Sequence, residues 1–103
     1  MPDFPFSFPS GVLGSVADLY VVSQNYVRVR IILVNTTASA VTVNMYVKGV
    51  SESTNRRICP KDLVFGAGYS AELDVEHTLG PGDKIIGEAT GNVDFSIHGE
   101  KVA

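Results

Sequence analysis

The stretch Val41-Thr42-Val43-Asn44-Met45-Tyr46-Val47-Lys48 decides the fold of this chain. Its apolar residues occupy every odd-numbered position, and the side chains between them are polar or, at Tyr46, amphipathic. Successive side chains of a β-strand point to opposite faces, so a period of two over eight residues predicts a strand with one face in the core. An amphipathic helix would need a period of 3.6, which this stretch does not have.

The same alternation recurs along the chain. In residues 26–34 the odd-numbered positions are valine, isoleucine or leucine, whereas Arg28 and Arg30 share the other face, which turns apolar at Ile32 and Val34. Residues 69–75 and 92–98 alternate in the same way and predict two further half-buried strands. Weaker strand patterns lie at 17–22 and 84–89, with short candidates at 57–59 and 63–65.

Turn-forming residues separate these strands. They cluster at 35–39, 66–68, 80–83 and 91–92, and residues 51–55 form a polar stretch that we interpret as a long loop. No window of ten residues carries a helical apolar stripe. The pattern therefore predicts an all-β fold, an antiparallel β-sandwich or jelly roll of about eight strands. We expect a single sandwich domain over residues 15–103, preceded by an extended arm at 1–14.

Composition limits the classes of function. A chain of 103 residues has the size of one domain, and its formal net charge of −3 leaves no excess of basic side chains to neutralise nucleic-acid phosphates. The first residues do not show a secretory pattern, and the apolar run 29–34 is too short to span a membrane. We therefore expect a soluble protein with neither nucleic acid nor membrane as a partner.

The single cysteine, Cys59, predicts a buried free thiol.

The sequence offers little chemistry. Both histidines, His77 and His98, are isolated, and neither a zinc-binding cluster nor a phosphate-binding loop occurs. Asp94, His98 and Glu100 would share one face of the last strand, which is either part of a metal site or, as we favour, a solvated face. We expect Asp83 to hydrogen-bond its own turn rather than act in catalysis. We expect no cofactor and no enzymatic activity.

Asn35-Thr36-Thr37 has the form of a glycosylation sequon. Without a secretory pattern we interpret it as a turn that follows a strand.

Several short motifs resemble a class of small β-sandwich virion proteins of tailed bacteriophages. They are Asn-Thr-Thr at 35–37 followed by Val-Thr-Val at 41–43, Gly-Asp-Lys-Ile at 82–85, and Ser-Ile-His-Gly-Glu at 96–100. The resemblance covers roughly residues 17–101. It implies a structural role on a phage particle, either as a head decoration (cement) protein or as a component of the tail, neck or fibre. It carries over no catalytic residue.

The N-terminal arm lies outside this resemblance and is interpreted from its own residues. Phe4, Phe6 and Phe8 are interleaved with Pro2, Pro5 and Pro9, and Pro5 and Pro9 restrict the residues before them to extended conformations. Burying even half of three phenylalanine rings is worth several kcal/mol at about 25 cal/mol per Å². The cost of ordering the arm is comparable, at roughly 1–2 kcal/mol per residue. The five residues therefore predict an anchor, which either folds back on its own sandwich or, as we favour, binds a neighbouring subunit.

The sequence thus favours a non-enzymatic virion structural protein, most simply a capsid decoration protein assembled into the particle in the host cytoplasm. Its partners would be other copies of itself, as a homo-oligomer on a symmetric particle, or a major capsid or tail protein. A carbohydrate-binding module that uses Tyr46 with Tyr20 or Tyr26 is an alternative, although the chain has no tryptophan. An enzyme of cupin type would need metal ligands that two isolated histidines do not supply.

Overall fold

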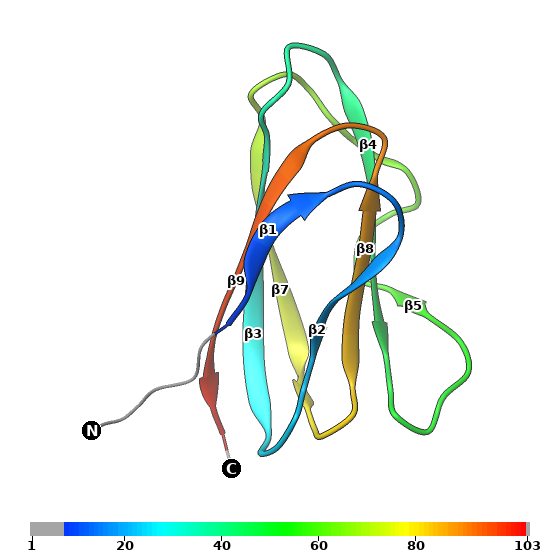
Figure 1. Ribbon diagram of the computed structural model, residues 1–103, viewed down its shortest axis with the longest axis vertical. Helices are drawn as coiled ribbons and strands as arrows, with labels where there is room; N and C mark the ends of the chain where they lie inside the picture. Colours follow the sequence, from blue (N-terminus) through cyan, green and yellow to red (C-terminus); the bar gives the residue numbers. More distant parts are fainter. Residues whose placement is uncertain (1–7, 103) are drawn as a thin grey trace.

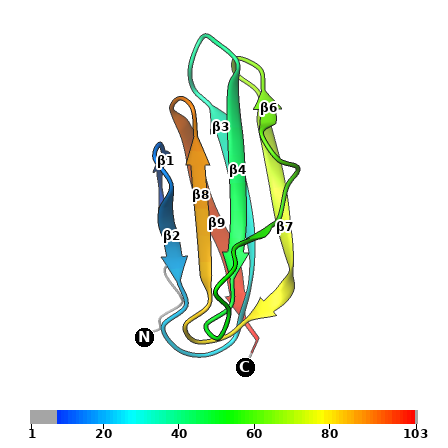
Figure 2. The ribbon, with the colours of Figure 1, turned by 90° about the vertical axis from the view of Figure 1, so that its right-hand side faces the viewer.

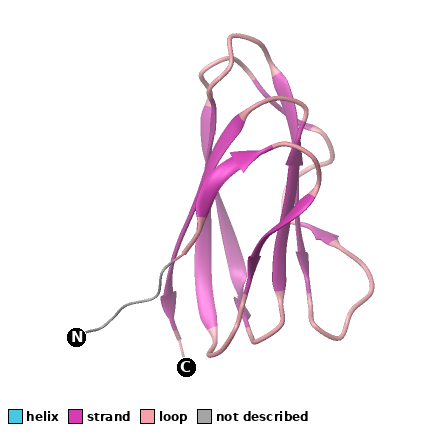
Figure 3. Cartoon of the chain, in the orientation of Figure 1, coloured by secondary structure: helices cyan, strands magenta, loops and turns pink. Residues whose placement is uncertain are grey.

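The computed structural model describes residues 8–102, apart from the side chains of residues 76 and 77. This part of the chain is all-β, with nine strands and no helix (Figure 3). It therefore also lacks a helix with the length and hydropathy needed to cross a membrane. The strands are β1 (Ser10–Leu13), β2 (Ala17–Val21), β3 (Val27–Asn35), β4 (Val41–Lys48), β5 (Arg56–Arg57), β6 (Leu63–Phe65), β7 (Ser70–Leu79), β8 (Lys84–Ala89) and β9 (Val93–Lys101).

The strands form two antiparallel sheets that pack face to face as a β-sandwich (Figures 1 and 2). The first sheet has the order β1-β9-β3-β7, and the second has the order β2-β8-β4-β5, with β6 also paired to β4. Consecutive strands mostly lie in different sheets, so the chain passes repeatedly from one layer to the other. This confirms the predicted all-β sandwich.

β5 and β6 together form one interrupted edge strand. Tyr46 of β4 pairs with Arg57 of β5, and Val43 of β4 pairs with Leu63 of β6. The same two β4 residues pair with β8 on their other side, so β5 and β6 share the remaining side of β4. The register shifts by three residues between the two pairings, and Cys59 lies in the irregular segment that takes up this shift.

The core sits between the sheets and follows the predicted alternation. In β3 every odd-numbered residue is buried, and Val27, Ile31 and Leu33 have no exposed surface at all. Val43 and Met45 of β4 are equally buried and face them from the second sheet. Because neither sheet could keep such a face in water, burial of these aliphatic side chains is the main force that holds the layers together.

The structure differs from the prediction at the start of the chain. Residues 10–13, which the sequence placed in the arm, form β1 and pair with β9, and Leu13 is buried. Only one of these four side chains is buried, so the sequence shows no alternation of apolar and polar residues here. The strand is therefore specified by its backbone pairing with β9 and not by a hydrophobic pattern. The sandwich therefore begins at Ser10, five residues before the predicted boundary. β7 and β9 also extend beyond their predicted ends, and residues 56–57 replace the strand expected at 57–59.

Asn35 is the centre of a buried hydrogen-bond cluster at one end of the sandwich. Its side chain has no exposed surface, and its Nδ2 donates to the carbonyl oxygens of Ser39 at 2.8 Å, Phe65 at 3.1 Å and Gly66 at 3.0 Å. Its Oδ1 accepts from the backbone N–H and the hydroxyl of Thr37. This confirms the predicted turn, and an amide nitrogen enclosed by three carbonyls has no room for a glycan.

Asp83 holds the turn between β7 and β8, as predicted. Its Oδ2 accepts a hydrogen bond from the backbone N–H of Gly80 at 2.8 Å. Its Oδ1 accepts a second one, at 2.9 Å, from the N–H of Val50 in the loop after β4. The carboxylate therefore fastens two neighbouring loops to each other.

Candidate functional site

The base of the N-terminal arm is fixed to the body of the protein. Phe8 is half-buried, packs against the core, and meets Tyr20 of β2 edge to face, with ring centroids 5.6 Å apart. The carbonyl oxygen of Pro9 accepts a hydrogen bond of 3.0 Å from the N–H of Ile97 in β9. Phe8 precedes β1 of the first sheet whereas Tyr20 belongs to the second, so their contact joins the two sheets along one side of the sandwich. Burial raises the pKa of the Tyr20 hydroxyl.

The structure thus divides the five predicted arm residues. Phe8 and Pro9 contact their own sandwich, in agreement with the fold-back interpretation for this part of the arm. Phe4, Pro5 and Phe6 lie outside the described residues.

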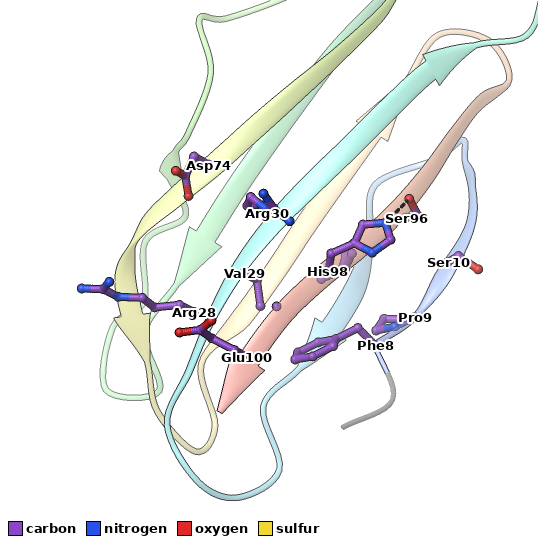
Figure 4. A pocket seen from close by; sticks show the side chains of 12 residues that line it. Phe8, Pro9, Ser10, Arg28, Val29, Arg30, Asp74, Ser96, His98 and Glu100 are labelled. Carbon is purple, nitrogen blue, oxygen red and sulfur yellow. Dashed lines mark hydrogen bonds between the residues drawn. The ribbon is translucent and has the colours of Figure 1, made fainter. Parts of the chain in front are cut away.

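A shallow open groove of about 830 Å³ lies beside this base, on the outer face of the first sheet (Figure 4). Phe8, Pro9 and Ser10 form one wall, and the floor and far wall come from β9, β3 and β7. Its charged side chains are Arg28, Arg30, Asp74 and Glu100, and the polar side chain of His98 lies among them.

The charged side chains of this groove are exposed to solvent. Arg30 Nε lies 3.3 Å from Glu72 Oε2, with about half of each side chain accessible, and such pairs contribute little to stability. The ring Nε2 of His98 lies 3.1 Å from the hydroxyl oxygen of Ser96. These groups can hydrogen-bond a polar ligand without first breaking a buried network.

A second, apolar hollow of about 460 Å³ continues the groove along the same face. Val12, Ile32 and Val34 line it, and both hollows share Ser10 and Ser96. Val12 is 56% exposed and Ile32 is 36% exposed. We call the two hollows together the outer groove. It runs over β9 from a charged end near Glu100 to a largely apolar end that also contains the exposed Asp94.

The predicted metal interpretation concerned Asp94, His98 and Glu100, all of which are exposed along β9. Among the residues that the structure describes, no group of three or more His, Cys, Asp or Glu side chains is arranged to hold a metal ion. His98 and Glu100 instead lie at the charged end of the outer groove.

The three tyrosines considered for carbohydrate binding lie in different surroundings. Tyr46 donates a hydrogen bond of 3.0 Å to Glu88 and lies under the guanidinium of Arg57, 5.0 Å from the ring centroid. Burial and the hydrogen bond to Glu88 raise its pKa. Tyr20 packs on Phe8, and Tyr26, in the loop before β3, is half-exposed.

Cys59 is buried and unpaired, which confirms the predicted free thiol. Burial raises the pKa of this thiol, so at neutral pH it is protonated and a poor nucleophile.

Comparison with protein families, curated proteins and solved structures found no match to this chain. The interpretation of the groove and arm therefore depends on their geometry. The sequence held one signal for the groove, the apolar Ile32 and Val34 on the otherwise charged face of their strand. No sequence signal joined them to Val12, because only the pairing of β1 and β3 on either side of β9 brings the three together.

Proposed function

We propose that this protein is a non-enzymatic structural subunit of a tailed-bacteriophage virion, with a jelly-roll body and an N-terminal arm that anchors it to its neighbours. The strand order supports the jelly roll. With β5 and β6 counted as one strand, eight strands form two sheets of four. Every connection crosses between the sheets except the one from β4 to β5. Jelly rolls occur in viral capsid proteins and lectins as well as in cupins, so by analogy the fold is compatible with an assembly role.

The anchored base of the arm is the observation that carries the proposal. Phe8 and Pro9 contact the sandwich, and Phe4, Pro5 and Phe6 precede them in the sequence. β1 runs antiparallel to β9, with Ser10 opposite Ser96, so Phe8 lies toward the C-terminal end of β9. Two more phenylalanines in the sequence before an anchored base suit attachment to another subunit.

The sheet edges offer further contacts for assembly. β7 is ten residues long, and within the described chain it pairs with β3 alone. Such an edge presents backbone donors and acceptors to which a strand of a neighbouring protein can add. Many equivalent weak contacts on a symmetric particle would together give stable attachment.

We propose capsid decoration as the role, with other copies and a major capsid protein as partners. A place in the tail, neck or fibre would use the same contacts.

A carbohydrate-binding module is the second candidate, and the charged part of the outer groove favours it. Its arginine, histidine and carboxylate side chains can hydrogen-bond sugar hydroxyls. A glycan array tests this candidate, and an array without a binder would remove it.

The proposed anchor is tested by replacing Phe4 and Phe6 together with alanine. We expect self-association, or binding to the particle, to weaken at least about tenfold, because two apolar rings lose their contacts. The thermal midpoint should not change at a concentration low enough for the parent to be monomeric, because the proposed anchor binds another subunit rather than its own sandwich. Sedimentation velocity over a range of concentrations measures the first effect and calorimetry the second. Association equal to that of the parent protein would refute the anchor.

A further inference from the structure

We propose that the free edge of β7 binds an extended segment of a different protein, in which basic residues alternate with apolar ones. The inference rests on the assembly role proposed above and names the chemistry of the partner that this edge accepts. β7 lies at one end of the first sheet, and within the described chain only β3 pairs with it (Figure 2). Such an edge can add a strand from another chain.

The backbone groups of alternate residues of β7 point away from β3. The N–H of Asn35 donates to the carbonyl oxygen of Tyr69, the residue before β7, at 2.9 Å. Hydrogen-bonded and non-hydrogen-bonded pairs alternate along an antiparallel ladder, and the register continues with Ser70 opposite Val34 and Ala71 opposite Leu33. Residues 71, 73 and 75 therefore bond to β3. The backbone groups that face the free edge are those of Ser70, Glu72 and Asp74.

Of the edges that the structure describes, β7 is the longest with a regular ladder. Its pairing with β3 is uninterrupted from Ser70 to Val75. β1 has only four residues, a bulge interrupts β2 between Asp18 and Tyr20, and β5 and β6 share one interrupted edge. Because short, bulged or interrupted edges resist the addition of a foreign strand, β7 is the edge most open to it.

The outer face of β7 selects a basic partner. Glu72 and Asp74 are both exposed and lie two positions apart, so their carboxylates project from the same face. The residues of an added strand that lie directly opposite them place their side chains on that face, where lysine or arginine would form cross-strand ion pairs. β3 shows this chemistry on the other side of β7. Arg30 lies opposite Asp74 in the register, and its Nε is 3.3 Å from Glu72 Oε2.

The inner face of β7 favours apolar residues between the basic ones. Ala71 and Leu73 pack against the core but remain partly exposed at its rim. A strand added to β7 would place its alternate side chains beside them and remove this apolar surface from water. β3 again has the required pattern, with valine or isoleucine at positions 27, 29 and 31 and arginine between them.

The described edges of a second copy of this chain do not have this pattern. Two β7 edges side by side would bring the carboxylates of Glu72 and Asp74 from both copies onto one face, and like charges directly opposite each other destabilise a sheet. β1, β2 and β6 contain neither lysine nor arginine, and β5 has only two residues. These observations favour a different protein as the partner.

The test uses the full chain and three synthetic peptides. The basic peptide is acetyl-Val-Arg-Val-Arg-Val-Arg-Val-amide, and the acidic peptide has glutamate in place of each arginine. The third peptide is the basic one with the backbone nitrogen of each arginine methylated, which keeps the charges but prevents pairing with the edge. Nuclear magnetic resonance of the labelled protein measures the affinity of each peptide and the hydrogen exchange of the β7 amides.

We expect the basic peptide to bind at least about fivefold more tightly than the acidic peptide, and the methylated peptide not to bind. The basic peptide should also slow hydrogen exchange at residues 70, 72 and 74, because their N–H groups then donate to the added strand. The full-length variant Glu72→Lys with Asp74→Lys should prefer the acidic peptide. Asp94→Lys with Glu100→Lys is the matched control and should keep the parent's preference, because both residues are exposed on β9, inside the sheet.

Three results would overturn the inference. They are a basic peptide that does not bind or binds without slowing exchange in β7, equal binding of the basic and acidic peptides, and equal binding of the methylated peptide, which would show attraction by charge without strand pairing. These measurements do not depend on the arm. The self-association of Phe4→Ala with Phe6→Ala tests the proposed anchor separately, so failure of the one can be distinguished from failure of the other.

Discussion

Replacement of Asn35 with aspartate is expected to lower the free energy of unfolding by about 3–5 kcal/mol. The two side chains have the same shape, so the core keeps its packing. The change replaces the Nδ2 donor, which serves the carbonyls of Ser39, Phe65 and Gly66, with an oxygen that repels them. The site has no exposed surface, so water cannot take over these hydrogen bonds. Urea unfolding followed by circular dichroism measures the loss.

The exposed Asn55 supplies the control for this prediction. It lies in the loop before β5, and Asn55→Asp should change stability by less than about 0.5 kcal/mol. The deficit of Asn35→Asp should also shrink as pH falls from 7 to 4. Burial among carbonyl oxygens raises the pKa of the introduced carboxyl, and once protonated it can donate one hydrogen bond again. A loss below about 1 kcal/mol at pH 7 would contradict the assigned role of Asn35.

Replacement of Phe8 with alanine is expected to cost about 2–3 kcal/mol of stability. The ring is half-buried and joins the start of the first sheet to Tyr20 of the second, so its loss opens one side of the sandwich. Phe8→Leu should recover about half of the loss, because it restores apolar contact without the edge-to-face geometry. Thermal unfolding by calorimetry measures both variants.

A double-mutant cycle separates the ring contact from general burial. Phe8→Ala and Tyr20→Ala, alone and combined, should give a coupling energy of about 0.5–1.5 kcal/mol for the aromatic pair. Zero coupling, or a cost for Phe8→Ala under about 0.5 kcal/mol, would mean that the base of the arm does not contribute to the fold.

The long strands could be predicted because one physical rule specifies them. Wherever one face of a strand packs on the opposite sheet, the residues of that face must be buried at every second position, and β3 shows this over nine residues. In β4 the apolar Val41, Val43 and Met45 are buried in the same way, although Asn44 between them is buried too. The order of strands within each sheet could not be predicted, since it depends on pairings between segments far apart in the chain. β3, for example, pairs with β9 from Val27 to Asn35, against residues 93–101.

Two features of the site could not be predicted from the sequence, again because they depend on residues far apart in the chain. Asn35 was correctly predicted to lie in a turn, but two of its carbonyl partners lie 30 and 31 positions further along the chain. Phe8 was grouped with Phe4 and Phe6 by composition, and only the pairing of β1 with β9 brings it beside Tyr20. The spacing of the phenylalanines indicated an arm. The attachment of the base of the arm to the sandwich could not be predicted, because it depends on contacts with residues far away in the sequence.

The structure shows which residues a deletion test of the arm should remove. A chain that starts at Gly11 lacks Phe8 and the first residue of β1, so a loss of association could not be distinguished from damage to the sandwich. A deletion of residues 1–7 leaves every described contact in place.

Native mass by light scattering, for the full chain and for the chain without residues 1–7, tests the central claim most directly. The account predicts that the full chain forms a defined oligomer and that the shortened chain is monomeric. It also predicts that both unfold at the same temperature at a concentration low enough for the full chain to be monomeric. A shortened chain that keeps the oligomer would contradict the claim that the arm joins subunits. A shortened chain that unfolds at a lower temperature than the full chain at that same low concentration would show instead that residues 1–7 belong to the body of their own sandwich.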